Sequence, residues 1–212
     1  MLSRLTRYWV YGGFLAGILI LILLPELSRN WSSALLAVFL QLPLYMLHQY
    51  EEHDNDSFRQ FFNRTIGGGQ EVLCPEAVFI INVPGVWGVI AASFYLAAHS
   101  SPGYGLIAAY LTLVNGVIHV AMGVASRSYN PGLATAFTLF LPASVFAIFE
   151  LQKTDAAGLR YHSLGLLTAL AIHAAIVAYV KAVKRSGIGM QIVNRLPIQH
   201  GVVSKTPQAP RR

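Results

Sequence analysis

The sequence predicts an all-α membrane protein, a polytopic helical bundle of about six transmembrane helices. The chain has 212 residues, of which 55% are hydrophobic and only 11% are charged. A soluble domain carries about a quarter charged residues, and the mean hydropathy here is +0.53. The apolar residues fall into runs of roughly twenty, the length that crosses a hydrocarbon core of about 30 Å.

Six such runs follow one another along the chain. In order, the predicted spans are residues 8–24, 31–50, 76–98, 104–125, 131–150 and 159–180. Together they form one predicted transmembrane domain, residues 1–185. Residues 186–212 are predicted to be a basic cytoplasmic tail that is partly disordered.

The ends of the spans have local signals. The first run is followed by Pro25 instead of a small-residue cleavage site, which indicates an uncleaved span rather than a signal peptide. Pro131 is predicted to be the first residue of the fifth span, because its missing N–H is tolerated there. Lys181, Lys184 and Arg185 are predicted to stop the sixth span.

The basic residues predict an orientation. With the amino terminus in the cytoplasm, twelve of the fifteen lysines and arginines lie in cytoplasmic segments and three lie in outer turns. This bias is what the positive-inside rule requires, although the tail supplies much of it. Both termini are therefore predicted to be cytoplasmic, in the cell (inner or plasma) membrane. The basic tail indicates attraction to anionic lipid headgroups, and no nucleic-acid partner is predicted.

A polar stretch separates the second and third spans. Within it Phe58, Phe61 and Phe62 share one helical face, with Arg59 and Arg64 alongside. The pattern suits either a short helix lying in the membrane interface or a loop whose phenylalanines pack on the bundle.

The polar residues of the spans gather in one leaflet. Spans two, four and six are predicted to run toward the cytoplasm and carry their polar groups in their second halves, whereas spans three and five carry them in their first halves. Polar groups are costly inside a membrane unless they face one another, an ion or a water-filled cavity. The pattern therefore predicts a shared site near the cytoplasmic side.

The segment His48-Gln49-Tyr50-Glu51-Glu52-His53 is the centre of this predicted site. Glu51 and Glu52 follow His48 by three and four residues, which brings both carboxylates beside the imidazole on a helix. Such a group is a candidate metal site or acid–base cluster. The alternative is that the two glutamates only begin the cytoplasmic loop. His53 is rotated by about 140° from His48 and is predicted to be solvated.

The other spans contribute further candidates. His119 has Asn115 one turn earlier, as a ligand histidine with a supporting amide would, or as an interhelical hydrogen-bonding pair would. His173 lies among alanines and is either a further metal ligand or structural. Asn82 is a second supporting amide. Arg127 and Asn130 are candidates for binding a phosphate or carboxylate headgroup, or for a charged turn that ends the helix.

These residues resemble a known family. His48-Gln49-Tyr50-Glu51-Glu52 is similar to the His-x-x-Glu-Glu signature of the HXXEE-domain proteins, which are predicted bacterial integral membrane proteins. Two later blocks also look like the family pattern, Asn115-x-x-x-His119 and the segment 129–135. The resemblance covers roughly residues 30–180. It implies that the two histidines, the two glutamates and Asn115 belong together, but it implies no activity.

Three functions are consistent with these patterns. In the preferred one, His48, Glu52 and His119, with His173 as an optional fourth ligand, hold a divalent metal, zinc or iron, and Glu51 is general base or further ligand. The protein would then be a hydrolytic or oxidative enzyme acting on a lipid or other apolar substrate at the cytoplasmic leaflet. The second is a proton-coupled carrier that uses the same cluster, and the third is a non-catalytic membrane scaffold.

Overall fold

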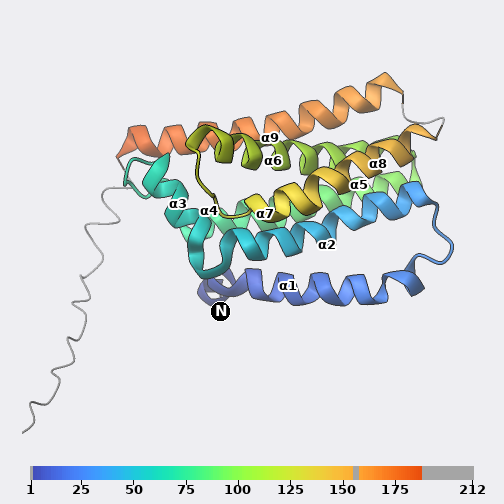
Figure 1. The fold of residues 1–212 in the computed structure, drawn as a ribbon, viewed down its shortest axis with the longest axis horizontal. Coiled ribbons are helices and arrows are strands. Elements are labelled where there is room, and N and C mark those ends of the chain that lie inside the picture. The colour runs from blue at the N-terminus through green and yellow to red at the C-terminus, as the bar shows by residue number, and fades with distance from the viewer. Residues whose placement is uncertain (1, 155–157, 188–212) are drawn as a thin grey trace, which may run out of the picture.

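The structure of this chain is a computed structural model, which describes residues 2–154 and 158–187. Within these residues every regular element is helical. The long helices lie side by side with their axes roughly along the same direction, and α3 covers one end of the bundle (Figure 1). The tail predicted for residues 186–212 lies outside the described residues from 188 onward.

The helices succeed one another in the order that the apolar runs predict. In chain order the elements are α1 (Leu2–Leu27), α2 (Ser33–His53), η1 (Asp54–Asp56), α3 (Ser57–Thr65), α4 (Pro75–Ile80), η2 (Ile81–Trp87), α5 (Gly88–His99), η3 (Pro102–Tyr104), α6 (Gly105–Ser126), α7 (Leu133–Thr135), η4 (Ala136–Phe140), α8 (Leu141–Gln152) and α9 (Leu159–Ser186). The segments α4–η2–α5 and α7–η4–α8 are each one continuous helical run. The middle of each run is a π-helical turn.

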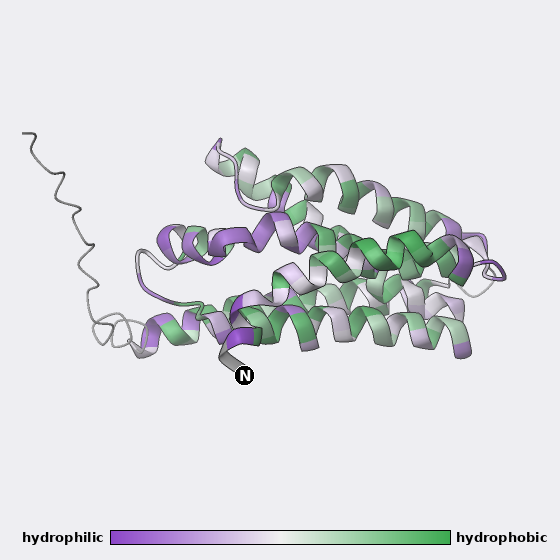
Figure 2. Cartoon of the chain, turned by 90° about the horizontal axis from the view of Figure 1, so that it is seen from below, coloured by the Kyte–Doolittle hydropathy of each residue, from purple (hydrophilic) through white to green (hydrophobic). Residues whose placement is uncertain are grey.

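Five of the helical runs are long and apolar enough to cross a membrane. They are Arg4–Leu27, Pro75–His99, Pro102–Ser126, Leu133–Gln152 and Leu159–Ser186. Large apolar side chains on them face outward, including Leu19 at 56% exposed and Leu167 at 64%. Figure 2 shows that the middle of the bundle is hydrophobic and that hydrophilic residues gather toward its ends. These features indicate a membrane protein.

Helix α2 is the predicted span that is not among those five. It is 21 residues long but carries Gln41, His48, Gln49, Glu51 and Glu52. It packs against α1, α5, α6 and α8, so its polar groups are covered by neighbouring helices. The other helices surround α2, so it can carry more polar side chains than a helix that faces lipid.

Two predicted boundaries need correction. The fifth helical run begins at Leu133 and not at Pro131, because Gly132 has a left-handed backbone with φ of 93°. The sixth run continues to Ser186 through the basic residues that were predicted to stop it. Lysine and arginine are good helix formers and are favourable at a helix C-terminus.

Prolines account for the two π-helical turns. Pro84 lies inside η2, and Pro142 follows directly after η4 and Leu141. Each proline lacks the N–H that would bond to the carbonyl one turn earlier, so the helix adjusts its hydrogen bonding locally. The second of these turns ends at Phe140, which is fully buried and packs against His48.

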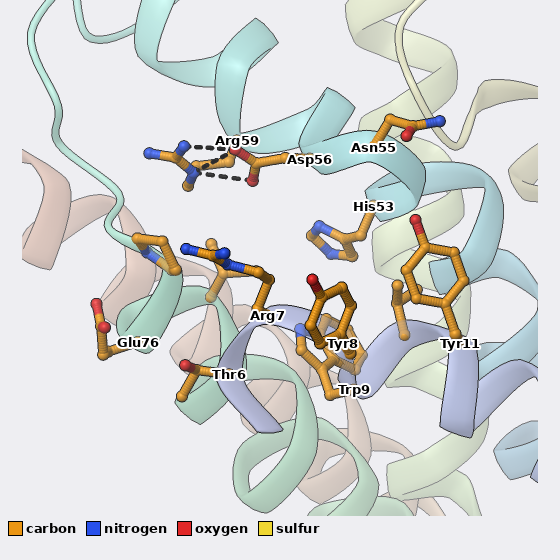
Figure 3. A pocket seen from close by; sticks show the side chains of 13 residues that line it. Thr6, Arg7, Tyr8, Trp9, Tyr11, His53, Asn55, Asp56, Arg59 and Glu76 are labelled. Atoms are coloured by element: carbon orange, nitrogen blue, oxygen red, sulfur yellow. Dashed lines mark hydrogen bonds and ion pairs between the residues drawn. The ribbon is translucent and has the colours of Figure 1, made fainter. Parts of the chain in front are cut away.

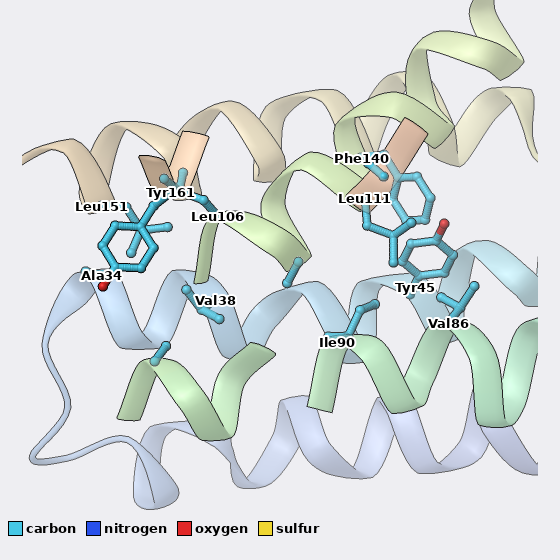
Figure 4. Packing of buried hydrophobic residues seen from close by; sticks show 13 residues of the cluster. Ala34, Val38, Tyr45, Val86, Ile90, Leu106, Leu111, Phe140, Leu151 and Tyr161 are labelled. Carbon is cyan, nitrogen blue, oxygen red and sulfur yellow. The ribbon is translucent and has the colours of Figure 1, made fainter. Parts of the chain in front are cut away.

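The main apolar core joins α2 to the helices around it. Figure 4 shows two groups of side chains along the bundle, one around Val38, Leu106 and Leu151 and the other around Tyr45 and Phe140. Between them α2 carries Gln41, whose amide nitrogen donates to the carbonyl oxygens of Ala37 and Ala143. The first group thus fills the bundle at the end opposite to α3, and the second packs against His48.

Candidate metal centre

Three predicted ligands meet between α2 and α6. His48 and Glu52 lie one turn apart near the end of α2, and His119 lies in the second half of α6; all three are at least 95% buried. The Nε2 atom of His119 is 3.3 Å from Oε1 of Glu52, and Nε2 of His48 is 3.6 Å from Oε2. One donor atom from each residue lies within 4.8 Å of the other two.

The hydrogen bonds of His48 assign its tautomer. Its Nδ1 lies 2.8 Å from the hydroxyl oxygen of Thr135. The Thr135 hydroxyl donates its single proton to the Glu51 carboxylate, which only accepts. The hydroxyl oxygen must therefore accept from His48, so Nδ1 carries the proton and Nε2 presents a lone pair. This Nε2 atom is buried and has no hydrogen-bond partner.

Asn130 assigns the same tautomer to His119. The Nδ1 atom of His119 lies 2.8 Å from Oδ1 of Asn130, while Nδ2 of Asn130 donates to the backbone oxygen of His119 at 3.0 Å. The second bond fixes the amide so that its oxygen faces the imidazole. An amide oxygen only accepts, so Nδ1 of His119 is protonated, and in the neutral ring Nε2 presents a lone pair to Glu52.

The centre therefore brings together two imidazole lone pairs and a carboxylate, with no donor hydrogen assigned between them. Acceptors that face one another repel unless a cation or added protons lie among them. In a tetrahedral zinc site, ligand atoms bonded at 2.0–2.2 Å are about 3.3 Å from one another, close to the two His–Glu distances. Neutral histidines whose other nitrogen donates to an oxygen are the usual metal-ligand arrangement.

Gly132 covers the centre on one side. A Cβ atom at this position would lie 2.8 Å from Cε1 of His48 and 2.9 Å from Cε1 of His119. The residue also has a left-handed backbone, which glycine adopts without strain. On another side the ring of Phe140 lies over His48, with 4.1 Å between ring centroids. The ligand atoms are thus enclosed by backbone and by an aromatic ring.

Glu51, predicted to be a general base or further ligand, lies outside the group of converging ligand atoms. Its carboxylate accepts from the backbone N–H groups of Ala134 and Thr135 at 3.0 and 2.7 Å, and from the hydroxyls of Thr135 and Tyr129. It therefore caps the first turn of α7. Burial, together with the hydrogen bond to Glu51, raises the pKa of Tyr129 to about 12.

Two predicted supporting amides have other partners. The Nδ2 atom of Asn115 donates to the Tyr45 hydroxyl at 2.6 Å and not to His119. Asn82 accepts from the amide of Gln49 at 2.8 Å and donates to the Val78 carbonyl at 2.9 Å. Both asparagines line the cavity beside the centre. The amide that supports His119 comes from Asn130, beyond the end of α6.

Of the remaining candidates, one is exposed and two are close to the centre. Arg127 is exposed at the end of α6, with a left-handed backbone. Asn130, predicted with Arg127 to bind a headgroup, is fully buried, and its Oδ1 lies 2.8 Å from Nδ1 of His119. His173 on α9 donates from Nδ1 to the Ala169 carbonyl and lines the cavity, but it does not belong to the three-residue group.

His53 departs from the prediction that it is solvated. It is 7% exposed, and its Nε2 lies 3.1 Å from Oε2 of Glu52. The Trp9 ring of α1 packs on it, with 5.3 Å between centroids. Sequence periodicity could not reveal this contact, because it depends on where α1 packs.

His53, which contacts Glu52, lies between two cavities of different character. A polar cavity of about 460 Å³ is lined by residues of α1, η1, α3 and α4, including Arg7, Tyr8 and Arg59 (Figure 3). A mainly apolar cavity of about 170 Å³ lies on the other side, lined by Glu52 and His119 and by residues of α6, η2 and α9. His53 lines both cavities.

The segment around Phe58 was predicted to be either a short helix in the membrane interface or a loop whose phenylalanines pack on the bundle. It is helical, and its Phe58 and Phe62 pack on the bundle against Val72, Leu73, Val78 and Val180. Phe58 also lies near the centre, with its ring centroid 6.0 Å from that of His119.

Comparison with known proteins identifies one family. The family model described as "Protein of unknown function with HXXEE motif" matches residues 39–147, which include all three ligands and Asn130. No curated protein and no solved structure matches the chain.

Proposed function

The chain belongs to the HXXEE family, and we propose that it is a metal-dependent membrane enzyme acting on a lipid or other apolar substrate. His48, Glu52 and His119 hold one divalent ion in this proposal. The proposal rests on one observation: two buried imidazole nitrogens and a buried carboxylate, from His48, His119 and Glu52, converge within 4.8 Å of one another. Three protein ligands with a further open position are the pattern of a catalytic site rather than a structural one.

The protein groups around the ion have separate tasks. Thr135 and Asn130 hold the two imidazoles in the tautomer that binds a metal. Gly132 covers both imidazoles on one side and Phe140 covers His48 on another, and both exclude water there. A bound divalent zinc or iron ion would act as a Lewis acid and lower the pKa of bound water.

The two cavities favour hydrolysis as the reaction class. A hydrolase in a membrane needs water on one side of its reactive centre and an apolar substrate on the other. The polar cavity reaches His53, whose Nε2 lies 3.1 Å from Oε2 of Glu52, and the apolar cavity reaches Glu52 and His119 from the side of α9. Two histidines and one carboxylate also suit ferrous iron, so the metal found by analysis decides between hydrolytic and oxidative chemistry.

The apolar core argues against the carrier. A carrier needs polar groups along the whole path across the membrane. At the end of the bundle opposite to α3, the described interior is filled by residues such as Ala34, Val38, Leu106 and Leu151. The one-sided placement of the ligands fits chemistry at one leaflet better.

We further propose that α2 is a sixth span and that both termini face the cytoplasm of the cell membrane. Both ends of the described chain lie at the same end of the bundle, beside α3 (Figure 1). An even number of crossings produces that arrangement, and the basic residues favour the cytoplasm for that side. The ligands then lie at the level of the cytoplasmic leaflet.

Metal analysis of the purified protein tests the proposed function. After loading with zinc or ferrous iron and removal of free ion, wild type is expected to retain about one equivalent. His48→Ala and His119→Ala should retain less than a tenth of that amount. His99→Ala is the matched control, because His99 lies at the far end of α5. A wild-type protein that retains no stoichiometric ion, or that behaves like both variants, would exclude the proposal.

A further inference from the structure

The apolar cavity has a reactive end and a hydrocarbon-like end. Along α6 it is lined by Leu111, Asn115, Ile118, His119 and Met122, and opposite them by Val86 of η2 and Ile172 of α9. Glu52 and His119 lie at one end, and Val86 and Leu111 lie at the other, toward the middle of the bundle. Its volume of about 170 Å³ is below the 300–1,000 Å³ typical of small-molecule pockets.

A groove on the outside of the bundle adjoins this cavity. It has a volume of about 430 Å³, lies between α4 and α9, and is lined by Cys74, Glu76, Ala77, Ile80, Ile81, Ala175, Ile176 and Tyr179. Ile81 and Ile176 line both the groove and the cavity. The two spaces therefore meet at these two side chains, one from each helix. Ile80 is 59% exposed beside them, so the groove opens onto the lipid-facing surface.

The end of the cavity beside α3 is closed. Val72, Leu73, Val78 and Val180 form a small apolar cluster, each at most 6% exposed, and Phe58 and Phe62 pack on it. Lys184 of α9 also donates to the Ile66 carbonyl at 3.2 Å, which ties α9 to the segment after α3. The boundary between the two spaces at Ile81 and Ile176 therefore faces the side of the bundle, and this cluster bounds it toward α3.

We propose that the gap between α4 and α9 admits one unbranched hydrocarbon chain of a membrane lipid, whose polar end comes to lie at Glu52 and His119. The volume and apolar walls of the cavity suit a single chain and leave no room for a second. The reactive end of the cavity lies near the hydrophilic end of the bundle and the apolar end near its middle, which is how a lipid lies in a leaflet. The proposal rests on the proposed function for the reaction at that polar end, but not for binding of the chain.

Photocrosslinking tests the passage. The protein is reconstituted in phosphatidylcholine vesicles that contain a long-chain fatty acid with a terminal diazirine, illuminated, and digested for mass spectrometry. Leu111 is fully buried and lines the cavity, so its labelling reports a chain inside. Leu19 on the lipid-facing side of α1 is the internal standard. Wild type is expected to be labelled at both positions.

Substitutions of Ile81 and Ile176, which line both the groove and the cavity, are expected to change the labelling of Leu111 but not that of Leu19. Ile81→Trp and Ile176→Trp should each lower labelling of Leu111 at least fivefold relative to Leu19, and Ile176→Ala should raise it. Leu170→Trp, on an exposed part of α9 outside both spaces, should leave it unchanged. Absence of the Leu111 label in wild type, or its persistence in both tryptophan variants, overturns the proposal.

The metal content of the same preparations keeps the two proposals apart. Protein that retains one equivalent of metal but shows no inner label contradicts the lateral passage alone. Protein with an inner label that depends on Ile81 and Ile176, but without bound metal, supports the passage and contradicts the metal-dependent function.

Discussion

Oδ1 of Asn130 lies 2.8 Å from Nδ1 of His119, so a residue beyond the end of α6 fixes the tautomer of a histidine within it. Asn130→Ala should weaken zinc binding about 10- to 100-fold, the usual effect of removing a hydrogen-bond partner of a ligand histidine. Asn130→Asp retains an acceptor and should restore most of the affinity. Competition with a chelator of known affinity measures both. Equal losses in the two variants would contradict a supporting role.

The two adjacent glutamates should respond differently to the same substitution. Glu52→Gln removes a ligand charge and should abolish stoichiometric metal binding. Glu51→Gln replaces an acceptor that receives two backbone N–H groups and two hydroxyls, so it should lower the free energy of unfolding by about 1–3 kcal/mol. Metal analysis and thermal unfolding in detergent measure the two effects. A Glu51→Gln protein that loses its metal but none of its stability would make Glu51 a ligand after all.

Gly132 is expected to tolerate no side chain. Gly132→Ala places a methyl group within 3 Å of both imidazoles and strains a left-handed backbone, which costs about 1–3 kcal/mol from the backbone alone. Both metal content and melting temperature should fall. Gly88→Ala is the control, because a Cβ there meets no atom within 4 Å and the residue is helical. A Gly132→Ala protein with full metal content would show that the loop is not tightly packed on the ligands.

Substitution of His173 tests whether the metal site has three protein ligands or four. It lines the cavity but is absent from the group of converging donor atoms, so His173→Ala should retain about one equivalent of metal where His119→Ala does not. Loss of the ion in His173→Ala would mean that α9 moves toward the centre when metal binds.

The raised pKa of Tyr129 predicts that the stability of the protein depends on pH in the alkaline range. Its pKa is raised to about 12 in the folded protein by burial and by the hydrogen bond to Glu51, against an ordinary value near 10. The folded state thus favours the protonated phenol, and this contribution to stability is present below pH 10 and is lost as the pH rises toward 12. The stability difference between wild type and Tyr129→Phe should shrink over that interval. A difference that stays constant would place the Tyr129 hydroxyl away from Glu51.

The fold was largely predictable because membrane helices have a strong signal. Runs of about twenty apolar residues mark the helices, and the structure places helix boundaries within a few residues of most of them. The largest differences are the start of α1, at Leu2 instead of residue 8, and the end of α9, where basic residues continue the helix to Ser186. The π-helical turns at Pro84 and Pro142 were not predicted, although both prolines are the kind of residue that produces them.

The ligand group was predictable in part. His48 and Glu52 are one turn apart, and His119 lies at the same predicted depth on a helix with the same direction, so their meeting follows from periodicity and span direction. The contacts of Asn130 with His119 and of Glu51 with the backbone of Ala134 and Thr135 were not predicted. Both depend on the conformation of the turn around Gly132. The shape of that turn depends on a left-handed backbone that the sequence pattern did not reveal. His53 was missed because its burial depends on Trp9 of another helix.

The three ligands and the residues that orient them all lie within the 39–147 segment that the family shares, whereas α1 and α9 lie outside it. Helix α1 contributes walls to the polar cavity, and α9 forms one side of the lateral passage. The proposed metal centre therefore lies wholly within the shared segment, whereas the polar cavity and the proposed lateral passage each take one wall from outside it. We expect family members to keep the three ligands and to differ in these outer walls.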